Sequence, residues 1–376
     1  MAEARRARPR STCRRALVLA GVVLTMLLAA CAAGAPSSVP AARPEGPGAT
    51  PASGAAPASA AASTPVAAAP APRAPVALRV AYTTASGVIA PVWIAHEAGL
   101  FREEGLDSSL QFITAGAPMS AAVRNGEIDL VVGAGGPSIV QGVFAGVDHV
   151  IVGMTSNVLP GAVYAQASIQ GPDDPRGGVL AVSRFKAIAD VIGRQGLLRL
   201  GLEPDKDVSV IQTGGIPEAM AAMETGVVQA ASLTSPITLK ARQLGYHELV
   251  DVAALQIPFA TSTIASTRRQ LAERPEVAEA ALRAIARAIK RYQDDPAYTM
   301  QVVAQYTNVA DPALLEEDYR ANLPTLQSDL AIDPQGLQAV LDLEENPAAR
   351  TAKPADFVDL GPLERLRASG FFERSQ

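Results

Sequence analysis

The chain has 376 residues, of which 48% are hydrophobic, and its formal net charge is −5. This length suffices for one large domain or for two coupled lobes with a substantial core. Because there is no excess of positive charge, the composition argues against a nucleic-acid partner.

Residues 1–30 have the pattern of an export signal. Several arginines precede an apolar run from Ala16 to Ala30, and a run of roughly 15 residues suits a signal-peptide core better than a membrane span. The run ends in "LAAC", Leu28 to Cys31, which resembles the lipobox of bacterial lipoproteins. The resemblance implies cleavage after Ala30 and lipidation of Cys31. A plain secretory signal with an incidental cysteine is the alternative, and export by the Sec or the twin-arginine route stays open.

Cys13 and Cys31 are the two cysteines of the chain. Cleavage and lipidation would leave the folded part without a free thiol, which excludes disulfides, cysteine-bound metals and cysteine nucleophiles. Residues 31–75 are almost entirely Ala, Pro, Gly and Ser. Such a segment buries too little to offset its ordering entropy, so we expect a disordered tether, with a mucin-like stalk as the alternative.

The folded part begins near Val76 and alternates apolar strands with short helices, which predicts a mostly parallel α/β sheet. Strands are expected at 77–83, 108–116 and 127–135, and helices at 89–99, 117–126 and 137–146. The same order returns about one hundred residues later, with strands at 177–184, 207–215 and 227–235 and helices at 185–202, 216–226 and 236–245. Matching junctions, such as Pro118 with Pro217 and Gly126 with Gly226, indicate two similar lobes.

The glycine-rich stretch "GEIDLVVGAGGPSIVQG", Gly126 to Gly142, invites comparison with a nucleotide-binding loop. A dinucleotide fingerprint would need a third glycine where Ser138 stands, and an acidic residue about 20 positions further on is missing. The stretch therefore predicts a small-residue loop at the carboxyl end of a parallel strand, where open α/β sheets bind ligands.

Several longer phrases point to one family. They are Pro91–Asp107, Ala121–Gly146, Gly178–Phe185 and Gly201–Gly226. Together they resemble the substrate-binding lipoproteins of ABC importers, in the branch that binds nitrate, aliphatic sulfonates, taurine and thiamine-pyrimidine precursors. The resemblance covers Val76 to Arg274 clearly and implies a type II periplasmic-binding-protein fold. In that fold each of two lobes is a mostly parallel sheet flanked by helices, and the ligand lies in the cleft between them.

The resemblance also implies how the chain is divided. We expect one lobe from residues 76–163 and 262–376 and the other from residues 164–261. The two crossings are expected within Val158–Ile169 and Leu255–Thr267. Downstream, Arg268–Gln293 has the pattern of one long amphipathic helix, and Pro347–Phe372 that of a turn-rich segment with a final helix.

Helix N-termini that face such a cleft would suit a carboxylate, sulfonate or phosphate. The segment Ser183–Lys186 is the sharpest candidate, and in relatives the matching segment contributes to the ligand site. Those relatives often continue with Gly-Ser or Ser-Ser, whereas this chain has Lys186 and Ala187, which departs from a sulfonate or nitrate cage. Ordinary capping and turn roles are the alternative for every candidate. The candidate ligand-binding residues are Thr83, Thr84, Ser86, Gly116, Ala117, Gly136, Pro137, Ser138, Ser183, Arg184, Phe185, Thr213, Gly214, Thr234 and Ser235.

Three further expectations concern the remaining side chains. Trp93 fits a core position, while Tyr82, Phe144, Tyr164 and Phe185 are candidate pocket aromatics. Ser138 and Ser235 should face one another across the cleft. His96, His149 and His247 lack ligand-like spacing, so we expect no metal and no other cofactor.

The resemblance implies a lipid-anchored, monomeric receptor on the periplasmic or extracellular face of a membrane. It would hand a small organic or anionic solute (a sulfonate, nitrate, taurine or a nitrogenous heterocycle) to an ABC permease and its ATPase, and it would have no catalytic residues. An enzyme on the same fold and a ligand-binding sensor module are the alternatives. A thiamine-pyrimidine synthase, one such enzyme, would call for a cysteine-rich segment, which the part after Cys31 lacks.

Overall fold

The computed structural model describes residues 74–169, 171 and 175–374, and it has a two-lobed α/β fold built on two five-stranded sheets. The predicted signal peptide, Cys31 and nearly all of the predicted tether lie outside the described residues. In the described part, no helix combines the length and the apolar character needed to cross a membrane.

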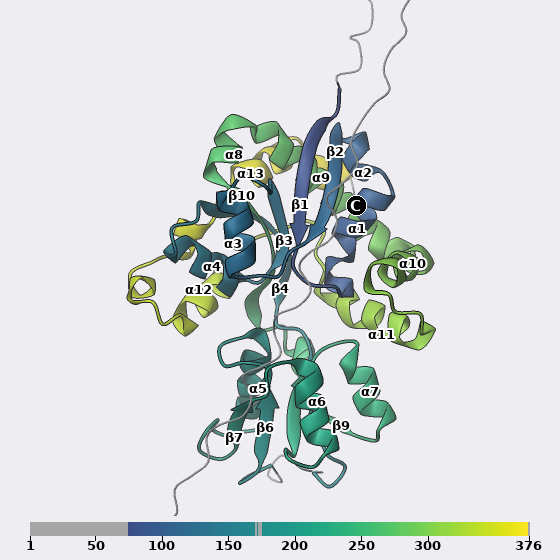
Figure 1. Cartoon of the computed structure of the whole chain (residues 1–376), viewed down its shortest axis with the longest axis vertical. Coiled ribbons are helices and arrows are strands. Elements are labelled where there is room, and N and C mark those ends of the chain that lie inside the picture. Colours follow the sequence, from purple (N-terminus) through teal and green to yellow (C-terminus); the bar gives the residue numbers. More distant parts are fainter. Residues whose placement is uncertain (1–73, 170, 172–174, 375–376) are drawn as a thin grey trace, which may run out of the picture. The chain divides into compact units, whose positions relative to one another are not determined.

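The first sheet has the strand order β2-β1-β3-β10-β4 (Figure 1). All of its strands are parallel to one another except β10, which pairs antiparallel with both β3 and β4. A mostly parallel sheet is confirmed, although β10 joins it only after the chain has passed through the second lobe. The strands are β1 (Val76–Tyr82), β2 (Leu106–Phe112), β3 (Leu130–Ala134), β4 (His149–Val158) and β10 (Pro258–Thr267).

The second sheet repeats this plan with the order β7-β6-β8-β5-β9. Here β5 is the antiparallel strand, between β8 and β9, while β6 is parallel to β7 and β8. The two sheets thus share one topology, as the internal repetition of the sequence predicts. The strands are β5 (Ala162–Ala165), β6 (Val179–Val182), β7 (Ser209–Gln212), β8 (Ala230–Leu233) and β9 (His247–Asp251).

Helices cover both faces of each sheet, which is why the central strands are continuous apolar runs rather than alternating ones. On the first sheet, Val80, Val132 and Ile264 belong to one core cluster with helices α1 and α9, while Val131 and Ala265 belong to another with α4 and α12. The helices are α1 (Ala90–Glu97), α2 (Leu100–Glu103), α3 (Ala117–Arg124), α4 (Gly136–Phe144), α5 (Ile188–Arg199), α6 (Ile216–Glu224), α7 (Ile237–Gln243), α8 (Arg268–Glu273), α9 (Pro275–Asp294), α10 (Pro296–Thr307), α11 (Pro312–Asn322), α12 (Pro334–Leu343), α13 (Gly361–Ala368) and α14 (Phe371–Arg374). Short 3-10 turns are η1 (Gly87–Ile89), η2 (Ala253–Leu255), η3 (Leu323–Thr325), η4 (Pro347–Arg350) and η5 (Pro354–Phe357).

The expectation of one long helix over Arg268–Gln293 is wrong. The structure has two helices, α8 and α9, which meet at Arg274 and Pro275. Proline lacks the N–H that would continue the first helix and disfavours helical backbone at the residue before it, so Pro275 begins a new helix instead.

Two short connections carry the chain between the sheets, at residues 159–161 and 252–257. They are hydrogen-bonded to each other, because the Leu159 amide donates to the Ile257 carbonyl over 3.1 Å and the Val252 amide donates to Gly161 over 3.0 Å. Gly161 has a φ of +80°, and a Cβ there would lie 2.4 Å from the Leu233 carbonyl oxygen. Only glycine fits this crossing without displacing the backbone.

An ion-pair cluster around the buried Asp129 ties β1, β3 and α9 together. Arg79 donates to it through its backbone amide and its guanidinium, over 2.8–2.9 Å, and Arg274 donates over 2.7 Å. Burial by itself would raise the pKa of Asp129, but the hydrogen bonds from Arg79 and the charges of both arginines outweigh it and lower the pKa to about 2.

Because the folded-state pKa is depressed, the carboxylate of Asp129 stabilises the fold above the unfolded value of 3.8, and this contribution is lost as the pH falls towards 2. Asp129→Asn should lower the free energy of unfolding at pH 7 by about 2 kcal/mol and flatten its fall between pH 4 and 2. Urea titrations across this range measure both effects. Asp107→Asn, at an exposed position on β2, is the matched control and should change neither the free energy of unfolding at pH 7 nor its fall at acid pH. If Asp129→Asn lost stability between pH 4 and 2 as steeply as the wild type, groups other than Asp129 would cause that loss.

Candidate functional site

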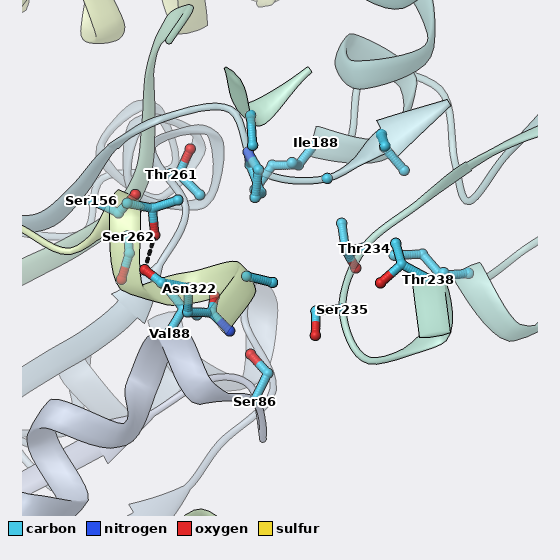
Figure 2. Close-up of a pocket in the computed structure, with 18 of the residues that line it drawn as sticks. Ser86, Val88, Ser156, Ile188, Thr234, Ser235, Thr238, Thr261, Ser262 and Asn322 are labelled. Atoms are coloured by element: carbon cyan, nitrogen blue, oxygen red, sulfur yellow. Dashed lines mark hydrogen bonds between the residues drawn. The ribbon is translucent and has the colours of Figure 1, made fainter. Parts of the chain in front are cut away.

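A cavity of about 1000 Å³ lies between the two lobes. It is lined by strand ends and helix starts of both sheets, and also by the α11–η3 segment near the C-terminus. Figure 2 shows Ser86, Ser156 and Asn322 on one side of the open space, with Thr234, Ser235 and Thr238 opposite them. The sheet topology explains this position, since the carboxyl ends of the parallel strands meet here.

Nine of the fifteen candidate residues line the cavity, and the other six do not. The lining candidates are Thr83, Thr84, Ser86, Pro137, Ser138, Ser183, Arg184, Thr234 and Ser235. The candidates outside the lining are Gly116, Ala117, Gly136, Phe185, Thr213 and Gly214. Ser138 and Ser235 both border the same space, but the direct partner of the Ser235 hydroxyl is Asp318, over 3.2 Å.

The six outlying candidates have local roles. Gly136 packs against β10 and α12, where a Cβ would lie 2.7 Å from the Ala260 Cβ. The Thr213 hydroxyl lies 3.0 Å from the Val182 carbonyl and closes the turn after β7. Gly116 and Gly214 have φ values of +94° and +102° and shape loops, while Ala117 and Phe185 are exposed.

Two of the helix N-termini at which small-anion binding is expected, at Ser183–Lys186 and after Ser86, already hold a carboxylate of the chain itself. Helix α5 begins at Ile188, and the Lys186 amide already donates to the Asp190 carboxylate over 2.8 Å. At the start of η1, the Gly87 amide donates to the Asp318 carboxylate over 2.6 Å. At both positions the chain supplies the anion itself, and a bound oxyanion would meet a carboxylate there.

A latch of three interlobe contacts borders the cavity, between α7 with its approach loop and α11. Arg242 pairs with Glu317 over 2.5 Å, Thr238 donates to Glu317 over 3.0 Å, and Ser235 donates to Asp318 over 3.2 Å. Asp318 is almost fully buried; burial raises its pKa, against hydrogen bonds from Gly87, Ser235 and Asn322 that lower it. A separate interlobe pair joins Lys186 to Glu345.

Tyr164 extends this network inside the second lobe. Its hydroxyl donates to Glu248 over 2.9 Å and accepts from Arg242 over 2.8 Å. Burial and the hydrogen bond to the Glu248 carboxylate raise the pKa of Tyr164 to about 12. Of the four candidate aromatics, Tyr164 alone lines the cavity; Tyr82 contacts Trp93 and Phe144 contacts Phe357 in the first lobe.

Several polar side chains at the cavity have no partner among the described residues, and two of them stand out. Ser156, on β4, is 1% exposed, and its hydroxyl makes no hydrogen bond. Arg184 is exposed, and its side chain makes no hydrogen bond or ion pair to the described part of the chain. The other lining arginines, Arg242 and Arg320, pair with Glu317 and Glu316. Ser156 and Arg184 are therefore free to contact a ligand, as are the lining hydroxyls that make no side-chain hydrogen bond to the described residues, namely those of Thr84, Ser86, Ser138, Ser183 and Thr234.

Sequence reasoning missed Ser156 together with the wall formed by α11 and η3. Ser156 lies in the polar triplet Thr155–Asn157 near the end of the otherwise mostly apolar β4, which is only a weak signal of a site. The described residues contain no cluster of three or more His, Cys, Asp or Glu side chains arranged to hold a metal ion.

The unpartnered hydroxyl of Ser156 leads to a stability prediction. Ser156→Ala removes a buried polar group that lacks a hydrogen bond, so the free energy of unfolding of the ligand-free protein should stay unchanged or rise by up to about 1–2 kcal/mol. Urea unfolding measures this. Thr155→Val is the contrasting variant. The Thr155 hydroxyl donates to Ser262 over 2.7 Å, so its loss should lower the free energy of unfolding. A loss of more than about 1 kcal/mol in Ser156→Ala would reveal a partner for that hydroxyl.

Several solved structures share this fold. The periplasmic aliphatic sulphonate binding protein SsuA from Escherichia coli is 20% identical, with a TM-score of 0.61, over 77% of this chain and 99% of that one. The alkanesulfonate-binding protein SsuA from Xanthomonas axonopodis pv. citri, bound to MOPS, is 20% identical, with a TM-score of 0.57, over 77% and 98%. The periplasmic nitrate-binding protein NrtA from Synechocystis PCC 6803 is 16% identical, with a TM-score of 0.59, over 79% and 89%. At this identity the likeness establishes the fold, that of type II periplasmic binding proteins.

No curated protein matches the chain. A family model does match it, over residues 71–307, which is more than half of its length. The chain belongs to the NMT1-like family.

Proposed function

We propose that this protein is the extracytoplasmic solute-binding component of an ABC importer, and that its solute binds in the cavity between the lobes. The observation that carries the proposal is the cavity itself, which is bordered by polar groups of both lobes, Ser156 and Arg184 among those without partners in the described part of the chain. The proteins named above, which share the fold, bind sulfonates and nitrate and are called periplasmic in two cases.

The proposed movement is a hinge between two lobes, one on each sheet; the division expected at 163/164 and 261/262 would cut through β5 and β10, so the lobes are instead divided at the two connections. The paired connections at 159–161 and 252–257 suit it, because few residues there need to change their backbone angles. Closure would bring the latch residues of α7 and α11 together around the solute, and opening would release the solute to the permease. Nothing in this scheme requires a catalytic residue.

A thermal-shift screen of sulfonates, carboxylates, nitrate and nitrogenous heterocycles tests the proposal. Any solute that binds the folded protein should raise its unfolding free energy by RT ln(1 + [L]/Kd). Turnover of a bound compound would favour the enzymatic alternative instead. If no compound of the panel raised the unfolding temperature, the solute-binding role would be contradicted.

We also propose that Cys31 carries the lipid that anchors the protein to a membrane, on its periplasmic or extracellular face. The supporting observation is the "LAAC" motif that follows the apolar leader. Expressed in a bacterium, the chain should enter the detergent phase on phase separation, and Cys31→Ser should move it to the aqueous phase. The Cys13→Ser control, inside the leader, should change nothing; an aqueous wild-type protein would refute the anchor.

A further inference from the structure

The size of the cavity and its free polar groups indicate which class of solute it binds. This inference rests on the solute-binding function proposed above. The size is informative because the lobes already touch. The latch joins α7 to α11, and Lys186 pairs with Glu345 through different elements. With these contacts formed, the space between the lobes still measures about 1000 Å³.

Such a volume is at the upper end of the range for sites that enclose drug-sized ligands, roughly 300–1,000 Å³. It corresponds to roughly thirty water molecules at about 30 Å³ each. Nitrate, with one nitrogen and three oxygens, would leave nearly all of it to water. Taurine would also leave most of it. A solute that fills the cavity needs a body on the scale of fused rings.

The walls indicate the chemistry of that body. Val88, Pro137 and Pro324 of the first lobe and Ile188 and Ile216 of the second contribute apolar surface. At two of the helix starts that border the cavity, those of η1 and α5, backbone amides already donate to the carboxylates of Asp318 and Asp190. A small, fully charged oxyanion would thus lose hydration without gaining free amide donors at those positions.

One positive charge at the cavity is not neutralised within the described part of the chain, namely that of Arg184. Its guanidinium can hold a carboxylate or sulfonate by two parallel hydrogen bonds. Ser156 comes from the opposite lobe, is buried, and offers an unpaired hydroxyl. The site therefore has one anion partner at an exposed position and one hydrogen-bonding group at a buried one, with apolar surface contributed by both lobes.

From this arrangement we infer that the solute is a bulky organic anion, with a mainly apolar ring body, an acidic group that pairs with Arg184 and a polar substituent that hydrogen-bonds to Ser156. Small oxyanions such as nitrate are not its ligands. Part of the wall that sets this preference, including Glu317, Asn322 and Pro324, lies after residue 307, beyond the stretch matched by the family model.

Calorimetry on the purified full-length chain in detergent, with detergent-only blanks, tests the size argument. The probes are nitrate, methanesulfonate and taurine against naphthalene-2-sulfonate, with neutral 2-naphthalenemethanol as the uncharged ring. We expect naphthalene-2-sulfonate to bind at least tenfold more tightly than each small anion. Small anions that bind as tightly as the ring compound would overturn the inference while leaving a solute-binding role intact. If none of these compounds binds, the inference fails, and the wider thermal-shift panel decides whether the solute-binding function fails with it.

Variants test the two polar contacts. Arg184→Gln should weaken naphthalene-2-sulfonate about tenfold and leave the neutral alcohol unchanged. Arg199→Gln, an exposed arginine on α5 outside the cavity lining, should alter neither. 6-Hydroxynaphthalene-2-sulfonate should bind more tightly than its parent, and Ser156→Ala should remove that gain. If Arg184→Gln weakened the binding of the sulfonate and of the neutral alcohol equally, the contact assigned to Arg184 would be contradicted. If the hydroxyl-bearing sulfonate still bound more tightly than its parent in Ser156→Ala, the contact assigned to Ser156 would be contradicted.

Discussion

Arg242→Glu should open the cavity and weaken the binding of naphthalene-2-sulfonate between about fivefold and 150-fold. The substitution places a carboxylate opposite Glu317 and beside Glu248, where the wild-type arginine bridges Glu317 and the Tyr164 hydroxyl. Like charges at this distance oppose lobe closure, and a shift of 1–3 kcal/mol in the closing equilibrium corresponds to that range of affinities. Small-angle scattering should show a larger radius of gyration for the variant, and calorimetry should show the weaker binding.

A charge exchange separates the latch from general damage. In the double variant Arg242→Glu with Glu317→Arg, the ion pair is restored in reverse, and affinity should recover in part. Lys240→Glu is the matched control, because Lys240 lies on the same helix but pairs with Glu224 within the second lobe, over 2.5 Å. If Lys240→Glu weakened binding as much as Arg242→Glu, the effect would reflect the net charge of α7 and not the latch.

Trp93→Ala should lower the free energy of unfolding by about 3–5 kcal/mol, the range expected when a large buried aromatic is truncated. Trp93 is fully buried, stacks on Tyr306 with ring centroids 4.8 Å apart, and meets Tyr82 edge-to-face at 5.6 Å. Since Trp93 is the one tryptophan of the chain, unfolding is best followed by far-ultraviolet circular dichroism in urea.

Trp93→Phe should cost considerably less, because it keeps an aromatic ring against Tyr82 and Tyr306 and removes an indole N–H that has no partner in the described part of the chain. Trp93 belongs to the core of the first lobe and does not line the cavity. Neither variant should therefore alter ligand affinity at temperatures at which the variant stays folded. A loss of affinity in folded Trp93→Phe would mean that the aromatic cluster shapes the site after all.

The internal repetition of the sequence predicted two similar lobes because each βα unit carries its own local signals. Strand ends, the Pro118 and Pro217 helix starts, and the Gly126 and Gly226 helix ends are all set by neighbouring residues. The antiparallel strands β5 and β10 carry no such signal. Their sheet partners are fixed by the crossings between lobes, which are long-range in the sequence, so periodicity alone could not place them.

The site was predictable to the extent that it consists of strand ends. Thr83, Ser138 and Thr234 follow buried strands and do line the cavity. At the starts of α5 and η1, two of the positions where an anion was expected, the carboxylates of Asp190 and Asp318 accept from the backbone amides instead. Asp190 lies only four residues after Lys186 and gave a local signal, whereas Asp318 reaches Gly87 across more than two hundred residues. No local pattern could have revealed that contact.

A crystal structure of the protein with naphthalene-2-sulfonate tests the central claim most directly. The account predicts the ring system in the cavity between the two sheets, the sulfonate within hydrogen-bonding distance of Arg184, and the Arg242–Glu317 contact retained. Electron density for the compound on an outer surface of either lobe, with the interlobe cavity filled by solvent alone, would contradict it.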